Sequence, residues 1–169
     1  MEAGSDVPPG VRPLAVVDLD GVLADVRHRL HHLDSRPKDW DAFFAAAADD
    51  PVLPQGRAVV DRLVAQGQEV VWLTGRPERC RDDTEQWLRV NGLPEGRLHM
   101  RGDGDRRPAR MTKLSVVRRL AADRTVSVVV DDDDMVVEAL RQAGFSVLHA
   151  QWMSEQGSLF DAQESEGRT

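Results

Sequence analysis

Side chains suited to phosphate and metal chemistry follow three apolar segments of the chain. Segment 14–20 ends in Asp18-Leu19-Asp20-Gly21, segment 69–75 leads into Thr74-Gly75-Arg76, and segment 126–130 leads into Asp131-Asp132. Clustered carboxylates need a cation nearby, because otherwise some of them must stay protonated. Ligands that offer only oxygen favour magnesium, which commonly takes one or two carboxylates together with a phosphate oxygen.

Three other groups complement a phosphate: the hydroxyl of Thr74, the guanidinium of Arg76 and the ammonium of Lys113. A metal-bridged phosphate beside a free carboxylate is a setting for nucleophilic attack by an aspartate. A second carboxylate two residues further on can serve as general acid and then as general base. Each group alone is also compatible with a turn, a strand exit or a solvated face. Their common position at strand ends favours one shared site, since ligands of open α/β sheets bind beyond the carboxyl ends of the strands.

Short β-branched runs alternate with stretches of helical periodicity. We predict strands at 14–20, 69–75, 97–100, 126–130 and 145–150, and helices at 38–48, 55–68, 76–92, 112–123 and 135–144. This alternation predicts an α/β fold, a doubly wound parallel five-stranded sheet with a small helical insertion at about 24–54, after the first strand. We expect a single domain over 14–153, a loose lead-in at 1–13 and a polar tail at 154–169.

The composition suits one soluble domain. The chain has 169 residues, of which 41% are hydrophobic and 30% charged, and its net charge is −7. The acidic balance argues against coating nucleic acid by bulk charge, although a local basic patch is compatible with it. A single cysteine, Cys80, excludes an internal disulfide, and the N-terminal segment lacks the features of a signal peptide. We therefore expect a cytoplasmic protein with no membrane association.

The order of these groups resembles the signature of the haloacid dehalogenase-like phosphohydrolases. Their four motifs correspond here to "DLDGVLAD", Thr74, Lys113 and Asp131-Asp132. The resemblance implies that Asp18 is the nucleophile that forms an aspartyl-phosphate, and that Asp20 is the general acid and then the base. It also implies that Thr74 and the Gly75 amide hold phosphoryl oxygens while Lys113 neutralises charge. Mg²⁺ would bind Asp18, the Asp20 carbonyl and Asp132, with Asp131 close by, and the first and fourth strands would be neighbours.

A narrower resemblance is to the 3′-phosphatase domain of bacterial and phage polynucleotide kinases. It is carried by "DLDGVLADVRHRL", "KDWDAFF", "LTGRPE", "TEQWL", "MRGDGDRRP" and "VVVDDDDMVV". The resemblance implies that Arg29 or Arg27, together with Arg76, Arg101 and Arg107, contacts the substrate. One departure is that 108–112 contains no acid before Lys113, where the family commonly has one. No P-loop occurs in the sequence, so we expect no 5′-kinase activity, and a kinase or ligase would be a separate partner.

The resemblance implies that the substrate is the phosphorylated 3′ end of a nucleic acid. Four arginines, Arg101, Arg106, Arg107 and Arg110, form a basic stretch in an acidic chain and would suit the flanking phosphates of such a strand. Asp103 and Asp105 would balance this stretch in the alternative, a solvated loop. A nucleoside monophosphate or another small phosphate ester is the second candidate substrate. A non-catalytic phosphate-binding module and a response-regulator-like receiver are alternatives of another class, and the motif order disfavours the receiver.

Three smaller interpretations complete the predicted site. His28, His31 and His32 suggest zinc by spacing, but no complete ligand set accompanies them. Trp40 has core-like spacing, although it could stack on a base. The run of four aspartates, 131–134, divides into a metal-binding pair and a pair that begins the next helix, where Asp caps free amides.

Overall fold

The computed structural model describes residues 11–153, 164 and 167, so the predicted lead-in and tail lie largely outside the described residues. Five parallel strands form one sheet in the order β3-β2-β1-β4-β5. Their bounds are β1 (Leu14–Val17), β2 (Glu69–Pro77), β3 (Leu98–Arg101), β4 (Val126–Asp131) and β5 (Val147–His149). The predicted doubly wound sheet is confirmed, and so is the pairing of the first strand with the fourth.

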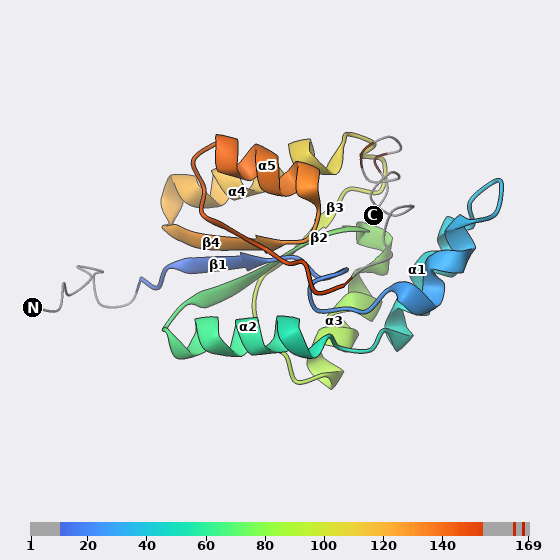
Figure 1. Cartoon of the computed structure of the whole chain (residues 1–169), viewed down its shortest axis with the longest axis horizontal. Helices are drawn as coiled ribbons and strands as arrows, with labels where there is room; N and C mark the ends of the chain where they lie inside the picture. The colour runs from blue at the N-terminus through green and yellow to red at the C-terminus, as the bar shows by residue number, and fades with distance from the viewer. Residues whose placement is uncertain (1–10, 154–163, 165–166, 168–169) are drawn as a thin grey trace, which may run out of the picture.

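Helices cover both faces of the sheet (Figure 1). The helices α2 (Pro54–Ala65) and α3 (Arg81–Val90) lie on one face, and α4 (Ala109–Asp123) and α5 (Asp134–Gln142) lie on the other. Strand β1 contributes side chains to the cores on both faces of the sheet, because successive side chains of a strand point in opposite directions. Ala15 and Val17 pack into the cluster under α2 and α3, while Leu14 and Val16 pack into the cluster under α4 and α5.

The predicted insertion after the first strand is a small helical unit with its own core. It contains the 3-10 helices η1 (Arg27–Leu33) and η2 (Ala46–Asp49) and the helix α1 (Trp40–Ala45) between them. Phe43 is fully buried and stands edge-on to Trp40 and Phe44. Trp40 is 8% exposed, so the prediction that it belongs to a core is confirmed. Figure 1 shows this unit beyond the sheet, on the side toward which β1 runs.

The chain leaves β1 through a tight turn that α2 holds in place. Gly56, in the first turn of α2, packs against the carbonyl of Val22, where an added Cβ would lie 1.9 Å from the oxygen. The Leu53 amide also donates to the Leu23 carbonyl at 2.7 Å. Only a glycine permits this close approach, so the segment that carries Asp20 is fixed against the start of α2.

Two predicted helix boundaries are wrong. Helix α4 begins at Ala109, directly after its N-cap Pro108, so Lys113 lies one turn inside the helix rather than at its start. Proline is well placed there because its missing amide needs no intrahelical partner. Pro77, expected in the first turn of a helix, is instead the last residue of β2, and α3 begins only at Arg81. Among the described helices none has the length and apolarity to span a membrane.

Candidate active site

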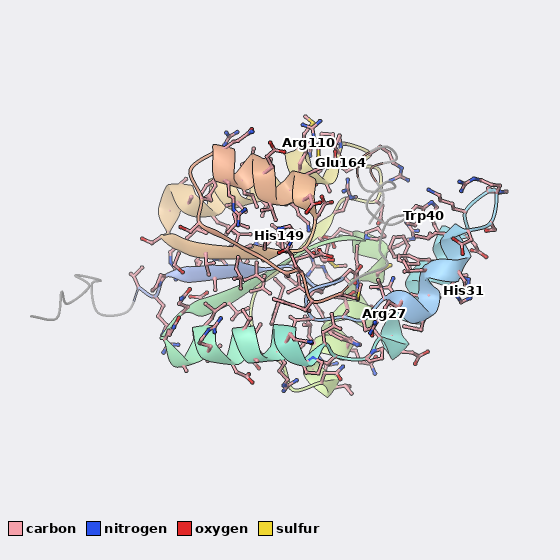
Figure 2. The ribbon with its side chains drawn as sticks, viewed as in Figure 1. Arg27, His31, Trp40, Arg110, His149 and Glu164 are labelled. Atoms are coloured by element: carbon pink, nitrogen blue, oxygen red, sulfur yellow. The ribbon has the colours of Figure 1, made fainter. Side chains whose placement is uncertain are left out.

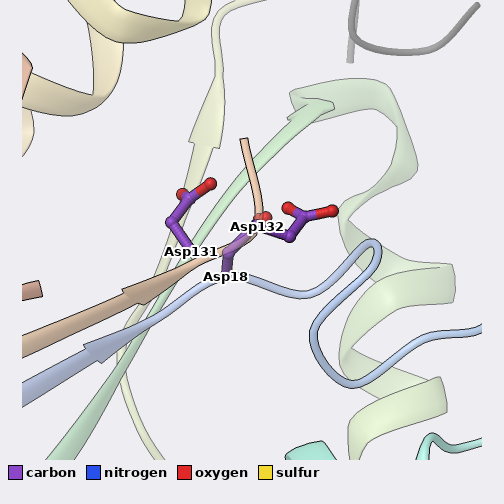
Figure 3. Close-up of side chains that lie close together, drawn as sticks. All are labelled: Asp18, Asp131 and Asp132. Carbon is purple, nitrogen blue, oxygen red and sulfur yellow. The ribbon is translucent and has the colours of Figure 1, made fainter. Parts of the chain in front are cut away.

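The pairing of β1 with β4 brings together three aspartates that are far apart in sequence. Asp18 follows β1, Asp131 ends β4 and Asp132 follows it (Figure 3). Each offers a carboxylate oxygen, and these oxygens lie within 4.8 Å of one another. All three side chains are buried, so their mutual repulsion is screened little by solvent. The sequence-predicted cluster therefore forms, and it forms in a setting that favours a cation.

Two carboxylates of this cluster, those of Asp18 and Asp132, have raised pKa values. Burial raises the pKa of Asp18 to about 7, with Lys113 opposing and Asp131 adding to the rise. Burial, together with the Asp18 and Asp131 charges, raises the pKa of Asp132 as well. The Oδ2 atom of Asp132 is buried and has no hydrogen-bond partner among the described residues. An all-oxygen donor set with one orphaned oxygen fits Mg²⁺.

Lys113 reaches this cluster from the second turn of α4. Its Nζ lies 2.7 Å from Oδ2 of Asp131 and 3.2 Å from Oδ1 of Asp18. Burial lowers the pKa of Lys113, but the Asp131 and Asp18 carboxylates more than offset this and leave it above its usual value. Lys113 is therefore a permanent positive charge beside Asp18. Both oxygens of Asp131 are engaged, since Lys113 contacts Oδ2 and the Asp133 amide donates to Oδ1 at 3.0 Å, so Asp18 and Asp132 have more free oxygens for a metal than Asp131 has.

Asp20, the second carboxylate of the first motif, faces away from this cluster toward two arginines. Its Oδ1 accepts from Nη2 and Nε of Arg76, at 2.6 and 3.0 Å, and from Nη2 of Arg29, at 3.0 Å. Burial alone would raise the pKa of Asp20, but the guanidiniums of Arg76 and Arg29 bring it down to about 2. Asp20 is thus held as a carboxylate in a fixed orientation.

The structure adds a residue that sequence reasoning missed, Asp50. Its carboxylate accepts hydrogen bonds from Nε and Nη2 of Arg29, at 2.8 Å each, and from Nη2 of Arg76, at 3.1 Å. His28 also lies 2.6 Å from Asp50 Oδ1 through its Nε2. Asp50 follows η2 at the end of the insertion, where no periodicity or motif marks it. Its one sequence signal was an aspartate before Pro51, just ahead of the sheet-packing helix.

Arg29 and Arg76, which the sequence predicts to contact substrate, are fully enclosed in this network. Their side chains are 0% and 1% exposed, respectively. Both hold Asp20, and Arg29 also lies 4.2 Å above the Phe43 ring. The arrangement favours a positioning role, while direct contact with a phosphate stays a prediction. Arg27, the alternative to Arg29, instead binds Asp25 at the surface.

Thr74 and Gly75 lie within β2, at the level of the carboxylates. Thr74 is 2% exposed, and its Oγ1 accepts a hydrogen bond from the Arg76 amide at 3.2 Å. This bond leaves the hydroxyl hydrogen free to turn toward a ligand, since a hydroxyl both donates and accepts. The predicted role of Thr74 and the Gly75 amide in holding phosphoryl oxygens is compatible with this geometry.

The predicted basic stretch divides into paired and unpaired arginines. Arg107 is exposed and forms an ion pair with Asp105 at 2.7 Å, and Arg110 pairs with Glu164 at 3.1 Å (Figure 2). Arg101 is 5% exposed and donates Nη1 to the Arg107 carbonyl, whereas its Nε and Nη2 have no hydrogen-bond partner in the described part of the chain. Burial lowers the pKa of Arg101. Its unused donors make it the best candidate of this stretch for an anion contact.

The run of four aspartates divides after Asp132, between the predicted metal-binding pair and the helix start. Asp133 is the N-cap of α5, and its Oδ1 accepts from the amides of Met135 and Val136 at 2.9 and 3.4 Å. Asp134 is the first residue of α5 and is exposed, with its carboxylate 3.0 Å from His149.

The three histidines of the insertion do not form a metal cluster within the residues that the structure covers.

Comparisons with known proteins agree with this geometry. The sequence profile described as "Polynucleotide kinase PNKP phosphatase domain" matches residues 13–152. A chain of the Pnkp1/Rnl/Hen1 RNA repair complex superposes with a TM-score of 0.70 at 21% identity, covering 88% of this chain and 46% of that one. This chain thus spans about half the length of that relative. No curated protein sequence matches.

Two other solved phosphatases share the fold. The class C acid phosphatase of Bacillus anthracis, with tungstate bound, gives a TM-score of 0.63 at 13% identity, covering 90% of this chain and 71% of that one. The D,D-heptose 1,7-bisphosphate phosphatase of B. bronchiseptica, complexed with magnesium and phosphate, gives a TM-score of 0.51 at 22% identity, covering 80% of this chain and 78% of that one. The profile match spans most of the chain, including every predicted catalytic residue, and the chain therefore belongs to the phosphatase-domain family of polynucleotide kinases, within the haloacid dehalogenase-like hydrolases.

Proposed function

We propose that the chain is a magnesium-dependent phosphatase that removes phosphate from the 3′ ends of polynucleotides through an aspartyl-phosphate on Asp18. The observation that carries this proposal is the buried cluster in which Asp18 faces both Lys113 and Asp132. A carboxylate with a raised pKa is more basic than an ordinary one, and it becomes available for attack once a cation displaces its proton. Family membership supports the same reaction class.

Asp18 would attack phosphorus with one carboxylate oxygen, and the ester oxygen would leave as the 3′-hydroxyl after taking up a proton. The Lys113 ammonium, 3.2 Å from Asp18, would stabilise the negative charge on the phosphoryl oxygens, and Thr74 would orient them. Mg²⁺ held by Asp18 and Asp132, with Asp131 and the Asp20 carbonyl nearby, would supply further neutralising charge. Water would then cleave the aspartyl-phosphate at phosphorus and release inorganic phosphate.

The environment of Asp20 favours one of its two predicted roles. A carboxyl with a pKa of about 2 is ionised at neutral pH, which is the form that deprotonates the attacking water. The two guanidiniums oppose the protonated form that would donate to the leaving oxygen. Protonation of the leaving group by Asp20 therefore requires that its contact with Arg76 loosen when substrate binds.

The polynucleotide preference depends on the arginines beside the site. Two buried donors of Arg101 have no partner among the described residues, and Arg101 contacts the Arg107 carbonyl, so a backbone phosphate would find charge-assisted contacts there. The competing candidate, a small phosphate ester, is favoured by a specific observation. Arg27, Arg107 and Arg110 each already have a carboxylate partner, which weakens the field available to a polymer.

The repair complex named for one structural relative suggests a division of labour. By analogy with that complex, we propose that a kinase or a ligase that acts on the same ends is a partner of this phosphatase. The single cysteine fits a reducing compartment such as the cytoplasm.

A direct test compares phosphate release from four substrates in Mg²⁺: a 3′-phosphorylated oligonucleotide, its 5′-phosphorylated isomer, nucleoside monophosphates and an aryl phosphate. The proposal predicts the highest kcat/KM for the 3′-phosphorylated oligonucleotide and no release by Asp18→Asn. Equal or higher values for the monophosphates would reject the polynucleotide preference and retain the phosphatase. Wild-type rates in Asp18→Asn would reject the mechanism.

A further inference from the structure

A second basic site lies at the opposite end of the sheet from the carboxylates. A cleft of about 380 Å³ is lined by β3 and by the C-terminal half of α4, with Arg97, His99, Arg119 and Arg124 as its basic residues and Asp123 as its acid. Arg97 directly precedes β3 and Arg124 lies two residues before β4, whereas the three clustered aspartates lie at or just beyond the carboxyl ends of β1 and β4. A cleft of this volume can hold a small ligand group.

The positive charge of this cleft is largely uncompensated. No described acid lies within ion-pair distance of Arg97 or Arg119, whereas Arg124 forms an ion pair with Glu69 at 2.9 Å. Arg107, by contrast, has its own carboxylate partner. Arginines without such a partner are notable in a protein that is acidic as a whole. Two guanidiniums that have no carboxylate partner among the described residues outnumber Asp123, the one acid of the cleft lining, and make a local attraction for an anion.

The floor of the cleft also has unused hydrogen-bonding capacity. Nε2 of His99 and Nε of Arg124 are buried and have no hydrogen-bond partner among the residues that the structure describes. Burial lowers the pKa of His99, and the charges of Arg97 and Arg119 lower it further. A bound anion would supply a hydrogen-bond acceptor to these nitrogens. Its negative charge would also offset the positive charge that lowers the pKa of His99.

Strand β3 connects this cleft with the arginines near the predicted active site. Alternation along the strand puts Arg97, His99 and Arg101 on the same face, and the strand rise separates Arg97 from Arg101 by roughly 13 Å. One extended polyanion could therefore contact both ends of β3. The lining contains no Phe or Trp on which a base could stack, so it suits a phosphate rather than a nucleobase.

We propose that this cleft binds a backbone phosphate of a polynucleotide strand, upstream of the 3′ end that reacts at Asp18. The proposal rests on the proposed function for the location of the 3′ end, but the binding itself does not require catalysis. Guanidinium forks match phosphate geometry, and the cleft is open to solvent on one side, so a phosphate of a longer strand can reach it. The site would add affinity for longer strands and leave the chemical step unchanged.

Binding is tested by an NMR titration that follows the imidazole resonances of His99, assigned with His99→Gln. The probe is a single strand of about ten nucleotides with a 3′-hydroxyl, which cannot be a substrate. The proposal predicts a saturable shift, with Kd raised roughly tenfold in Arg119→Glu. Arg118→Glu is the matched control, because Arg118 is the exposed neighbour on the same helix and does not line the cleft; it should change Kd less than about twofold.

Three results would overturn the proposal: no shift of His99, equal weakening by both charge reversals, or tighter binding of AMP or inorganic phosphate than of the strand. The last result would assign the cleft to a free nucleotide or anion. Kinetics gives an independent reading: Arg119→Glu should raise KM for a 3′-phosphorylated ten-nucleotide strand roughly tenfold and leave KM for a 3′-phosphorylated dinucleotide unchanged. Failure of every 3′-phosphorylated substrate would reject the proposed function, and the titration would still decide the cleft.

Discussion

Arg76 and Asp20, which are 56 positions apart in the chain, form a buried ion pair in which Nε and Nη2 of the arginine both donate to Oδ1 of the aspartate. The Asp50 carboxylate completes this pair by binding Arg29 and Arg76 together. The insertion that carries Arg29 and Asp50 is thereby joined to the turn after β1. The orientation of Asp20 consequently depends on Asp50, which lies outside the predicted catalytic set.

Asp50→Asn should destabilise the fold and reduce activity together. The amide cannot balance two buried guanidiniums, and breaking a buried charge pair typically costs about 3–5 kcal/mol. Chemical denaturation should show a loss of this order, and kcat should fall because Asp20 loses its fixed position. The neighbouring Asp49 is exposed, so Asp49→Asn is the matched control and should change the free energy of unfolding by less than about 0.5 kcal/mol. Similar losses in both variants would contradict the role of Asp50.

Asp132→Asn should weaken Mg²⁺ activation far more than Asp134→Asn. Asp132 is buried beside Asp18 and has an unused oxygen, whereas the side chain of Asp134 is 82% exposed and binds His149. The measurement is the Mg²⁺ concentration that gives half-maximal rate, for which we predict at least a tenfold increase in Asp132→Asn. Equal increases in the two variants would refute the division of the aspartate run.

Asp133→Ala should destabilise the protein by about 1 kcal/mol through loss of the α5 cap, and Asp133→Asn should restore most of it. The reason is that Oδ1 of Asp133 accepts from two amides at the start of the helix, an interaction that an asparagine oxygen can reproduce. Thermal or urea denaturation measures the effect. Mg²⁺ activation should stay near wild type in Asp133→Asn, which separates the cap from the metal site.

Stability without metal should fall as the pH rises from about 4 to 7. Asp18 holds its proton up to about pH 7 in the folded state, whereas the unfolded chain releases it near 3.8, so its contribution is complete below 3.8 and is lost as the pH approaches 7. Asp20 has the opposite sign, but its contribution changes only below that range. Urea midpoints in EDTA should follow this trend. Saturating Mg²⁺ should flatten it, whereas Asp18→Asn should remove only the part due to Asp18, because burial also raises the pKa values of Asp132 and Asp133.

Much of the candidate site was predictable because its residues occupy strand ends. Asp18, Thr74 and the Asp131-Asp132 pair follow apolar β-branched runs, and parallel strands bring such ends to one edge. Asp50 was not predictable, because it lies after a 3-10 helix in the insertion and acquires its role only through tertiary contacts with two arginines. Local sequence contains no information on such a long-range pair.

The roles of the arginines were also beyond sequence reasoning. A guanidinium near a phosphate site can hold the phosphate or hold a catalytic carboxylate, and the residue type is the same in both cases. Both arginines are buried, and their partners separate them here: Arg76 is paired with Asp20, whereas Nε and Nη2 of Arg101 have no hydrogen-bond partner among the described residues. The start of α4 was missed for a simpler reason, since the helix begins directly after Pro108, ahead of the apolar periodicity.

The most direct test of the account is to trap the covalent intermediate. The enzyme is mixed with an oligonucleotide carrying a ³²P-labelled 3′-phosphate and is quenched in acid within the first turnover. The account predicts label on the peptide that contains Asp18, removed by hydroxylamine as an acyl phosphate is, and absent from Asp18→Asn. Label on another residue, or burst-free turnover with unlabelled protein and an active Asp18→Asn, would contradict nucleophilic catalysis by Asp18.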